Sequence, residues 1–108
     1  MKLIFAIVHN DDSALVSSSL TKAGFYVTKI ASTGGFLMSG YTTFISGVAD
    51  DKVDEAIEII SKFSKKRTQV VSNDIAMATS NMTSNIPIEV TVGGGTIFVL
   101  NIERFERV

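Results

Sequence analysis

A pair of glycines followed by an aromatic residue is the part of the sequence best suited to hold a small ligand. Gly34 and Gly35 permit positive φ angles and a close approach of the backbone, so their amides can face an anion. Phe36 follows them and offers a flat face on which a nucleobase can stack. Thr28 and Thr33 add hydroxyl groups. The spacing leaves two interpretations open: a ligand-binding loop, or a loop whose apolar side chains pack on a neighbouring subunit.

The histidine and the acidic pairs favour structural roles over catalysis. His9 is the only histidine and the chain has no cysteine, so we expect His9 to end a strand beside a helix cap rather than to hold a metal. The acidic pairs Asp11–Asp12 and Asp50–Asp51 lie where helix N-caps belong, and capping accounts for them without chemistry. No nucleophile is paired with a base, so the sequence predicts no enzyme and no catalytic residue.

A basic run and a glycine run have structural explanations of the same kind. Lys65, Lys66 and Arg67 could hold a phosphate, but the basic end of a helix needs no ligand. Gly93–Gly95 lies between two predicted strands rather than before a helix. It therefore matches neither the dinucleotide-binding nor the P-loop fingerprint, and it predicts a hairpin turn.

Composition limits the class of protein. The 108 residues suit one domain spanning 1–108, and the net charge of -1 argues against broad electrostatic binding to nucleic acid or to an anionic membrane. The apolar start, MKLIFAIV, is too short to cross a bilayer and is not followed by a cleavage site, so we expect a cytoplasmic protein. The hydrophobic fraction of 45% is high for a small domain and indicates self-association.

The hydrophobic pattern predicts an α+β fold. Helices are expected from Asp11 to the stop at Gly24 and over 50–66, where apolar residues recur at helical spacing. The order is β-α-β-β-α-β followed by more β, which is the ferredoxin-like pattern with an additional C-terminal strand. The segment 73–85 lacks any period and is long for a connection, as functional loops often are. Strands are expected at 3–8, 25–32, 42–48, 68–72, 86–92 and 96–102.

The first and last strands carry apolar residues at both odd and even positions. Two helices can cover only one face of the sheet, so the other face needs a different partner. A second copy of the chain is the simplest partner, and a closed ring of sheets around a common axis would bury that face.

Several motifs together resemble the PII-like cyclic di-AMP receptor family of Gram-positive bacteria. They are MKLIFAIV, TGGFL, TTF and IPIEVTVGGGTIFVL, and the likeness runs over nearly the whole chain. The resemblance implies a cytoplasmic PII-like homotrimer that is not an enzyme and that binds cyclic di-AMP at three clefts between subunits.

The resemblance also implies roles for individual residues. Thr28 would support a phosphate, Phe36 would pack against a base, and Gly47 would leave room for the ligand. Phe98 would help to close the cleft from a facing strand. The full set implied at the site is Tyr26, Thr28, Gly35, Phe36, Leu37, Tyr41, Gly47, Gly93, Gly94 and Phe98.

Two positions depart from the family pattern. Tyr26 stands where the family usually has an arginine near the phosphates, and Tyr41 stands where it has an asparagine that reads the adenine edge. We therefore expect a sensor of cyclic di-AMP or a related adenine nucleotide, which reports through loops 33–41 and 73–85 to a downstream protein. The alternative hypothesis is a diverged trimer that has lost nucleotide binding and acts only through protein contacts.

Overall fold

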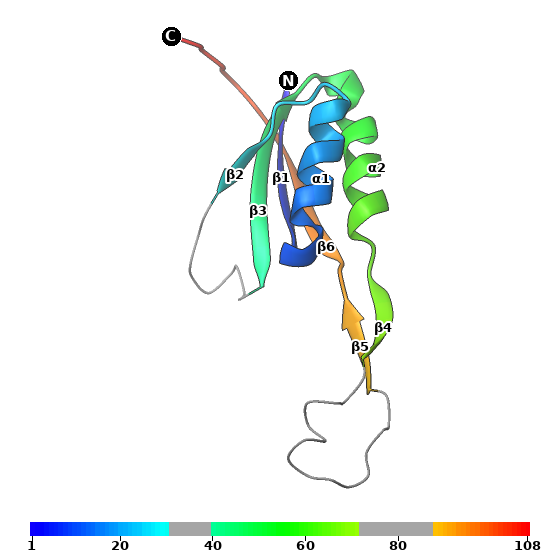
Figure 1. The fold of residues 1–108 in the computed structure, drawn as a ribbon. Coiled ribbons are helices and arrows are strands. Elements are labelled where there is room, and N and C mark those ends of the chain that lie inside the picture. The colour runs from blue at the N-terminus through cyan, green and yellow to red at the C-terminus, as the bar shows by residue number, and fades with distance from the viewer. Residues whose placement is uncertain (31–39, 72–87) are drawn as a thin grey trace, which may run out of the picture.

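The computed structural model describes residues 1–30, 40–71 and 88–108. The α+β prediction is confirmed (Figure 1). One predicted strand is shorter than expected at its start, because the Phe25 amide still donates to the Leu20 carbonyl at the end of the first helix. The elements are β1 (Lys2–His9), α1 (Asn10–Lys22), β2 (Thr28–Ile30), β3 (Tyr41–Val48), a 3-10 turn (Asp50–Lys52), α2 (Val53–Ser64), β4 (Arg67–Val71), β5 (Ile88–Val92) and β6 (Gly95–Asn101).

Four of the strands form an antiparallel sheet in the order β2-β3-β1-β6. In its register, His9 lies opposite Tyr41 and Val8 lies opposite Gly95. The fourth place of the ferredoxin-like sheet therefore belongs to β6 and not to β4, the strand that directly follows α2. β4 pairs with β5 instead, and this ribbon extends away from the rest of the molecule (Figure 1).

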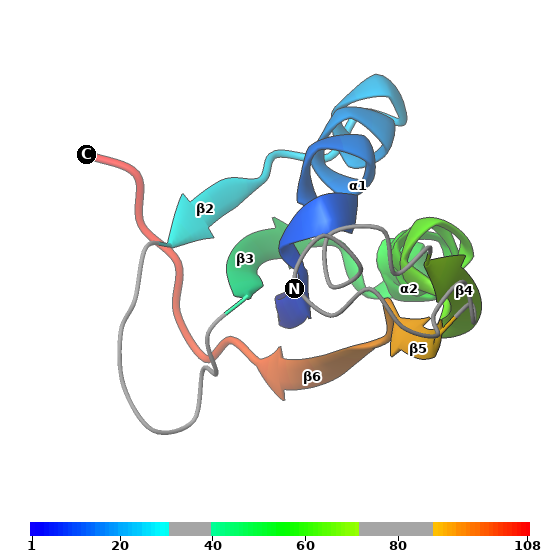
Figure 2. The same cartoon turned by 60° about the horizontal axis from the view of Figure 1, so that its bottom comes forward.

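Both helices cover the same face of the sheet (Figure 2). The alternation of β1 places Ile4, Ala6 and Val8 on this face, where each is almost fully buried. On α1, Val16 is fully buried against this face, whereas Leu15 is 52% exposed. The remaining core residues come from α1, β3 and α2: Leu20, Phe44, Val48, Ala56 and Ile60.

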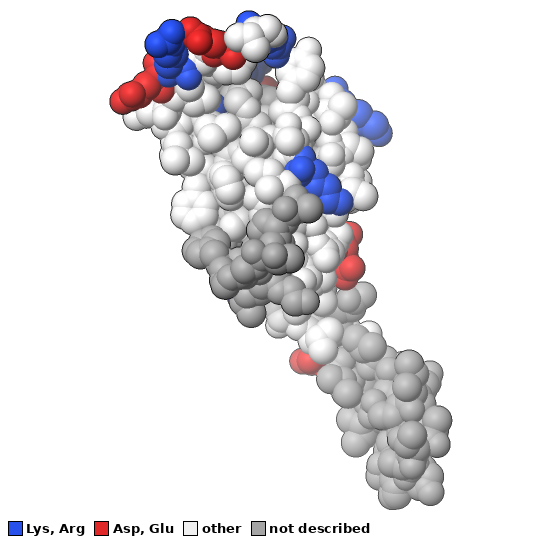
Figure 3. Space-filling model, turned by 90° about the vertical axis from the view of Figure 1, so that its left-hand side faces the viewer, with Lys and Arg blue, Asp and Glu red and all other residues white. Residues whose placement is uncertain are grey.

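The opposite face of the sheet is apolar, and no helix among the described residues lies over it. Thr28, Ile45, Phe5 and Phe98 are successive cross-strand partners, so their side chains form one row across this face. Phe98 is 42% exposed and Leu100 is 48% exposed. Viewed from the side away from the helices, the middle of the surface is mostly uncharged (Figure 3). The predicted second apolar face is thus present.

The helix caps differ from those expected. His9 ends β1 beside the cap, as predicted, but it is also the cap itself, because its Nδ1 accepts from the Asp11 amide at 3.2 Å. Asp11 and Asp12 are therefore not the capping residues of α1. Asp50 also binds elsewhere: its carboxylate lies 2.7 Å from the N-terminal amine, and neither the 3-10 turn nor α2 has a side-chain cap.

Candidate functional site

The larger of two hollows near the predicted site residues lies where β1 ends and where β3 and β6 begin. We call it the glycine hollow. Its volume is about 470 Å³, within the range of small-molecule sites. It brings together three of the predicted site residues, Tyr41, Gly93 and Gly94. The full lining is Ile7, Tyr41, Lys66, Gly93, Gly94, Gly95 and Thr96.

Glycine is required in the wall of this hollow. Gly93 and Gly94 have φ angles of 81° and 86°, which residues other than glycine rarely adopt. A Cβ atom on Gly93 would lie 2.5 Å from the Lys65 carbonyl oxygen and 2.6 Å from Nη1 of Arg67. The Gly94 amide donates to the Ser64 carbonyl at 2.6 Å. The turn between β5 and β6 is therefore fixed against the end of α2.

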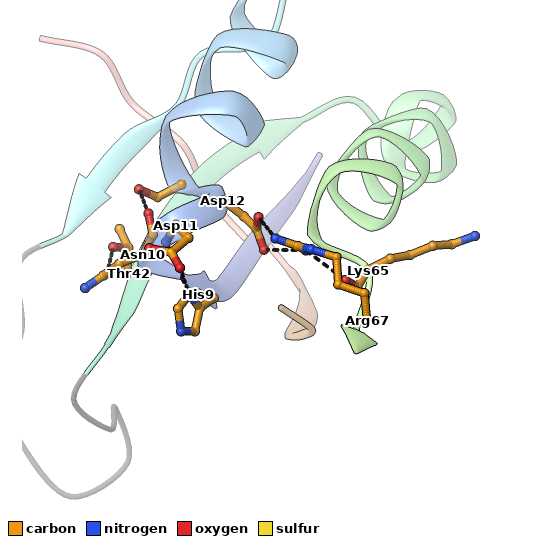
Figure 4. Close-up of polar contacts among 8 residues, drawn as sticks. His9, Asn10, Asp11, Asp12, Thr42, Lys65 and Arg67 are labelled. Carbon is orange, nitrogen blue, oxygen red and sulfur yellow. Dashed lines mark hydrogen bonds and ion pairs between the residues drawn. The ribbon is translucent and has the colours of Figure 1, made fainter. Parts of the chain in front are cut away.

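An ion pair that the sequence did not predict lies behind this wall. Arg67 donates to Asp12 through two nitrogens, Nη2 to Oδ1 at 2.9 Å and Nη1 to Oδ2 at 3.3 Å (Figure 4). The side chain of Asp12 is only 8% exposed. The hydrogen bond and the charge of Asp12 raise the pKa of Arg67 above its usual value. The two residues are far apart in the sequence, so spacing could not have revealed the pair.

Tyr41 is held at the mouth of the hollow by the start of α1. Its ring meets the His9 ring edge to face, with centroids 5.5 Å apart and an interplanar angle of 76°. Beside it, the Asn10 amide donates to the Gly40 carbonyl at 2.7 Å, and the Thr42 hydroxyl donates to Oδ1 of Asn10 at 2.5 Å. The aromatic plane that Tyr41 presents is thus positioned by contacts on both sides of it.

A smaller hollow of about 190 Å³ holds two other predicted residues, Tyr26 and Gly47. We call it the tyrosine hollow. The Tyr26 carbonyl accepts from the Ser46 hydroxyl at 2.6 Å, but the Tyr26 side chain is 82% exposed. A Cβ atom on Gly47 would meet the Met1 side chain at 3.6 Å, an ordinary contact. The fold of one chain therefore does not require glycine at 47, and the space beside it is open.

The remaining predicted residues are dispersed. Thr28 lies on β2 and Phe98 on β6, the two edge strands of the sheet, so three strand spacings of about 5 Å separate them. Gly35, Phe36 and Leu37 lie outside the described residues. Four residues line the glycine hollow that our site prediction lacked: Ile7, Lys66, Gly95 and Thr96. The place of Lys66 beside the glycine turn depends on a contact between distant segments.

Comparison with known proteins assigns the chain to a family. The sequence model of the cyclic-di-AMP receptors matches residues 1–108. This chain belongs to the cyclic-di-AMP receptor family. It is also similar to a crystal structure described as that of a functionally unknown protein from Pediococcus pentosaceus. The two share 37% sequence identity and a TM-score of 0.79, over 99% of this chain and 96% of that one.

Two further observations describe this member of the family within residues 1–30, 40–71 and 88–108. Over these ranges, no helix is long and apolar enough to span a membrane. The same ranges contain no cluster of three or more histidine, aspartate or glutamate residues arranged to hold a metal ion. The glycine hollow, whose lining includes Tyr41, is the larger of the two hollows that contain predicted site residues.

Proposed function

We propose that the protein is a cytoplasmic homotrimeric receptor, one PII-like domain per chain, that binds cyclic di-AMP in clefts between subunits. The observation that carries this proposal is the division of the site residues between two hollows. Tyr41, Gly93 and Gly94 line the glycine hollow, whereas Tyr26 and Gly47 line the tyrosine hollow. The family assignment supports the ligand, and the division supports the placement between subunits.

The two hollows are too far apart to serve one ligand within one chain. Tyr41 begins β3 and Gly47 lies six residues later on the same strand, a separation of roughly 20 Å at the rise of an extended strand. A ring of three chains can place the glycine hollow of one subunit against the tyrosine hollow of the next. The same arrangement buries the apolar sheet face that carries Phe98 and Leu100.

The chemistry of the lining suits an adenine nucleotide. The Tyr41 ring offers a base a stacking surface, and Thr28, on β2 and outside the lining of both hollows, offers a phosphate its hydroxyl. The glycine wall lets a ligand approach the backbone closely. Because Tyr26 and Tyr41 replace residues typical of the family, a related adenine nucleotide is an alternative ligand. Binding and release, rather than turnover, constitute the activity.

The signal is carried by a change in the loops. Ligand binding favours one arrangement of loops 33–41 and 73–85 by interacting with it more strongly than with others. The β4–β5 ribbon leads from the glycine hollow into the second of these loops and projects from the sheet (Figure 1). A downstream protein would read the altered surface.

Titration calorimetry with cyclic di-AMP, cyclic di-GMP and ATP tests the proposal. We expect saturable binding of cyclic di-AMP at one molecule per chain, together with a higher melting temperature, since a ligand that binds only the folded state stabilises it. Light scattering should give a trimeric mass. If no nucleotide binds or shifts the melting temperature but the trimer is present, the diverged scaffold is the correct interpretation. A monomeric mass would contradict both.

A further inference from the structure

Three consecutive cations, Lys65, Lys66 and Arg67, follow α2, and their surroundings differ. Arg67 is committed to the bidentate pair with Asp12, and its Nη1 also donates to the Lys65 carbonyl at 3.1 Å. The side chain of Lys65 extends away from this pair (Figure 4). Lys65 and Arg67 therefore lie outside the lining of the glycine hollow.

Lys66 is in a different position. It lines the glycine hollow, and it is the one charged residue among the described residues of that lining. Its side chain is exposed, and in the described part of the chain it forms no ion pair. A phosphate that entered the hollow could thus pair with the Lys66 ammonium group without breaking an existing ion pair.

The backbone on both sides of Lys66 is held against the glycine turn. Ser64 accepts from the Gly94 amide at 2.6 Å, and a Cβ on Gly94 would lie 3.7 Å from Cβ of Lys66. On the other side, Arg67 is fixed by Asp12 and lies directly behind Gly93. Lys66 therefore extends toward the hollow from a fixed backbone, although its own side chain is long and has several rotatable bonds.

We propose that Lys66 pairs with a phosphate of the bound nucleotide and that Arg67 is the residue that positions it. This inference rests on the proposed function and names the anion-binding residue of that site. A lysine serves a phosphate well as a point charge, and a charge-assisted contact is about twice as strong as a neutral one.

The adjacent lysine provides a matched control. Affinity for cyclic di-AMP is measured for the wild type, Lys66→Gln and Lys65→Gln. Each protein is titrated at about 50 mM and about 200 mM salt. We expect Lys66→Gln to weaken binding about tenfold, equivalent to one charged contact. It should also reduce the salt dependence, because one ionic contact is lost. Lys65→Gln removes the same charge one residue earlier and should leave both quantities unchanged, while Lys66→Arg should retain binding.

Arg67→Lys tests the positioning role separately. It keeps the positive charge but loses the planar fork that holds Asp12, so affinity should fall while the salt dependence stays that of the wild type. Unchanged binding by Lys66→Gln, or equal losses in Lys66→Gln and Lys65→Gln, would overturn the inference while leaving the proposed function intact. Failure of the wild type to bind any nucleotide would instead refute the proposed function, and this inference with it.

Discussion

The two hollows differ in how firmly the chain builds them. The glycine hollow is fixed from three sides, by the His9–Tyr41 ring contact, the Gly94–Ser64 hydrogen bond and the Asp12–Arg67 ion pair. The tyrosine hollow is less than half its volume and is bordered by a tyrosine that is 82% exposed. One half of the proposed cleft is thus organised within the subunit, whereas the other half is open for a neighbour to complete.

This difference assigns distinct tasks to the two hollows. Preorganised groups bind a ligand with little loss of conformational freedom, so the glycine hollow should supply most of the affinity. The tyrosine hollow should contribute less, and only in the assembled trimer. Substitutions that have matched controls elsewhere in the chain can break or sharpen this contrast.

Gly93→Ala should have the largest effect. The new Cβ would overlap the Lys65 carbonyl, and alanine would be forced into a left-handed conformation that alone costs roughly 1–2 kcal/mol. Gly24→Ala is the control, because Gly24 has a φ of 96° but open space around it. Urea unfolding should show a loss of about 1–2 kcal/mol for Gly24→Ala and a clearly larger loss for Gly93→Ala. Equal losses would mean that the glycine wall is not tightly packed.

Tyr41→Ala should weaken nucleotide binding by about 1–3 kcal/mol if the ring stacks on a base. Tyr41→Phe keeps the ring and should bind as the wild type does, since stacking does not need the hydroxyl. Calorimetric titration of both variants gives the comparison. A large loss in Tyr41→Phe would show that the hydroxyl group, rather than the aromatic plane, recognises the ligand.

Tyr26→Arg should strengthen nucleotide binding, by a smaller factor than the one by which Tyr41→Ala weakens it. It places a guanidinium in the tyrosine hollow, where a phosphate of a ligand shared between subunits would lie. The gain should be at most about 1 kcal/mol, the upper end for a solvent-exposed ion pair, because position 26 is exposed to solvent. Unchanged affinity, measured under the same conditions as the wild type, would place the ligand outside the tyrosine hollow.

Asp50→Asn should have the smallest effect, and only as a function of pH. The N-terminal amine holds the pKa of Asp50 below its ordinary value, first by a hydrogen bond and then by its charge. Because its pKa is lower in the folded state, Asp50 stabilises the protein above its unfolded-state pKa of about 3.9. This stabilisation is lost as the pH falls through the folded-state pKa. Wild type and variant should therefore differ slightly in melting temperature at pH 6, and the difference should shrink as the pH falls below the unfolded-state pKa and through the folded-state pKa. A difference that persists in acid would contradict this pairing.

Local patterns in the sequence were sufficient for the helices and strands. The spacing of Val53, Ala56 and Ile60 predicted α2, and the alternation from Ile88 to Val92 predicted β5. The place of β6 beside β1 could not be predicted from pattern, because β4 and β6 both follow α2 in the chain and either strand could fill the edge of the sheet. The decision depends on β4 pairing with β5 instead.

Only those parts of the candidate site that lie in local motifs could be predicted from the sequence. Tyr41, Gly93 and Gly94 could be named from the motifs, and the structure brings them together. The Asp12–Arg67 pair and the lining role of Lys66 depend on contacts between segments far apart in the sequence, which spacing does not encode. Asp12 was interpreted as a capping residue because its position at a helix start is equally compatible with that role.

The central claim is that nucleotide binds where the glycine hollow of one subunit meets its neighbour. Calorimetric titration of the purified protein with cyclic di-AMP tests it most directly. The account predicts saturable binding at one ligand per chain, weakened by Tyr41→Ala and unaffected by Lys65→Gln. Absence of binding by cyclic di-AMP, cyclic di-GMP and ATP to an intact trimer would contradict it.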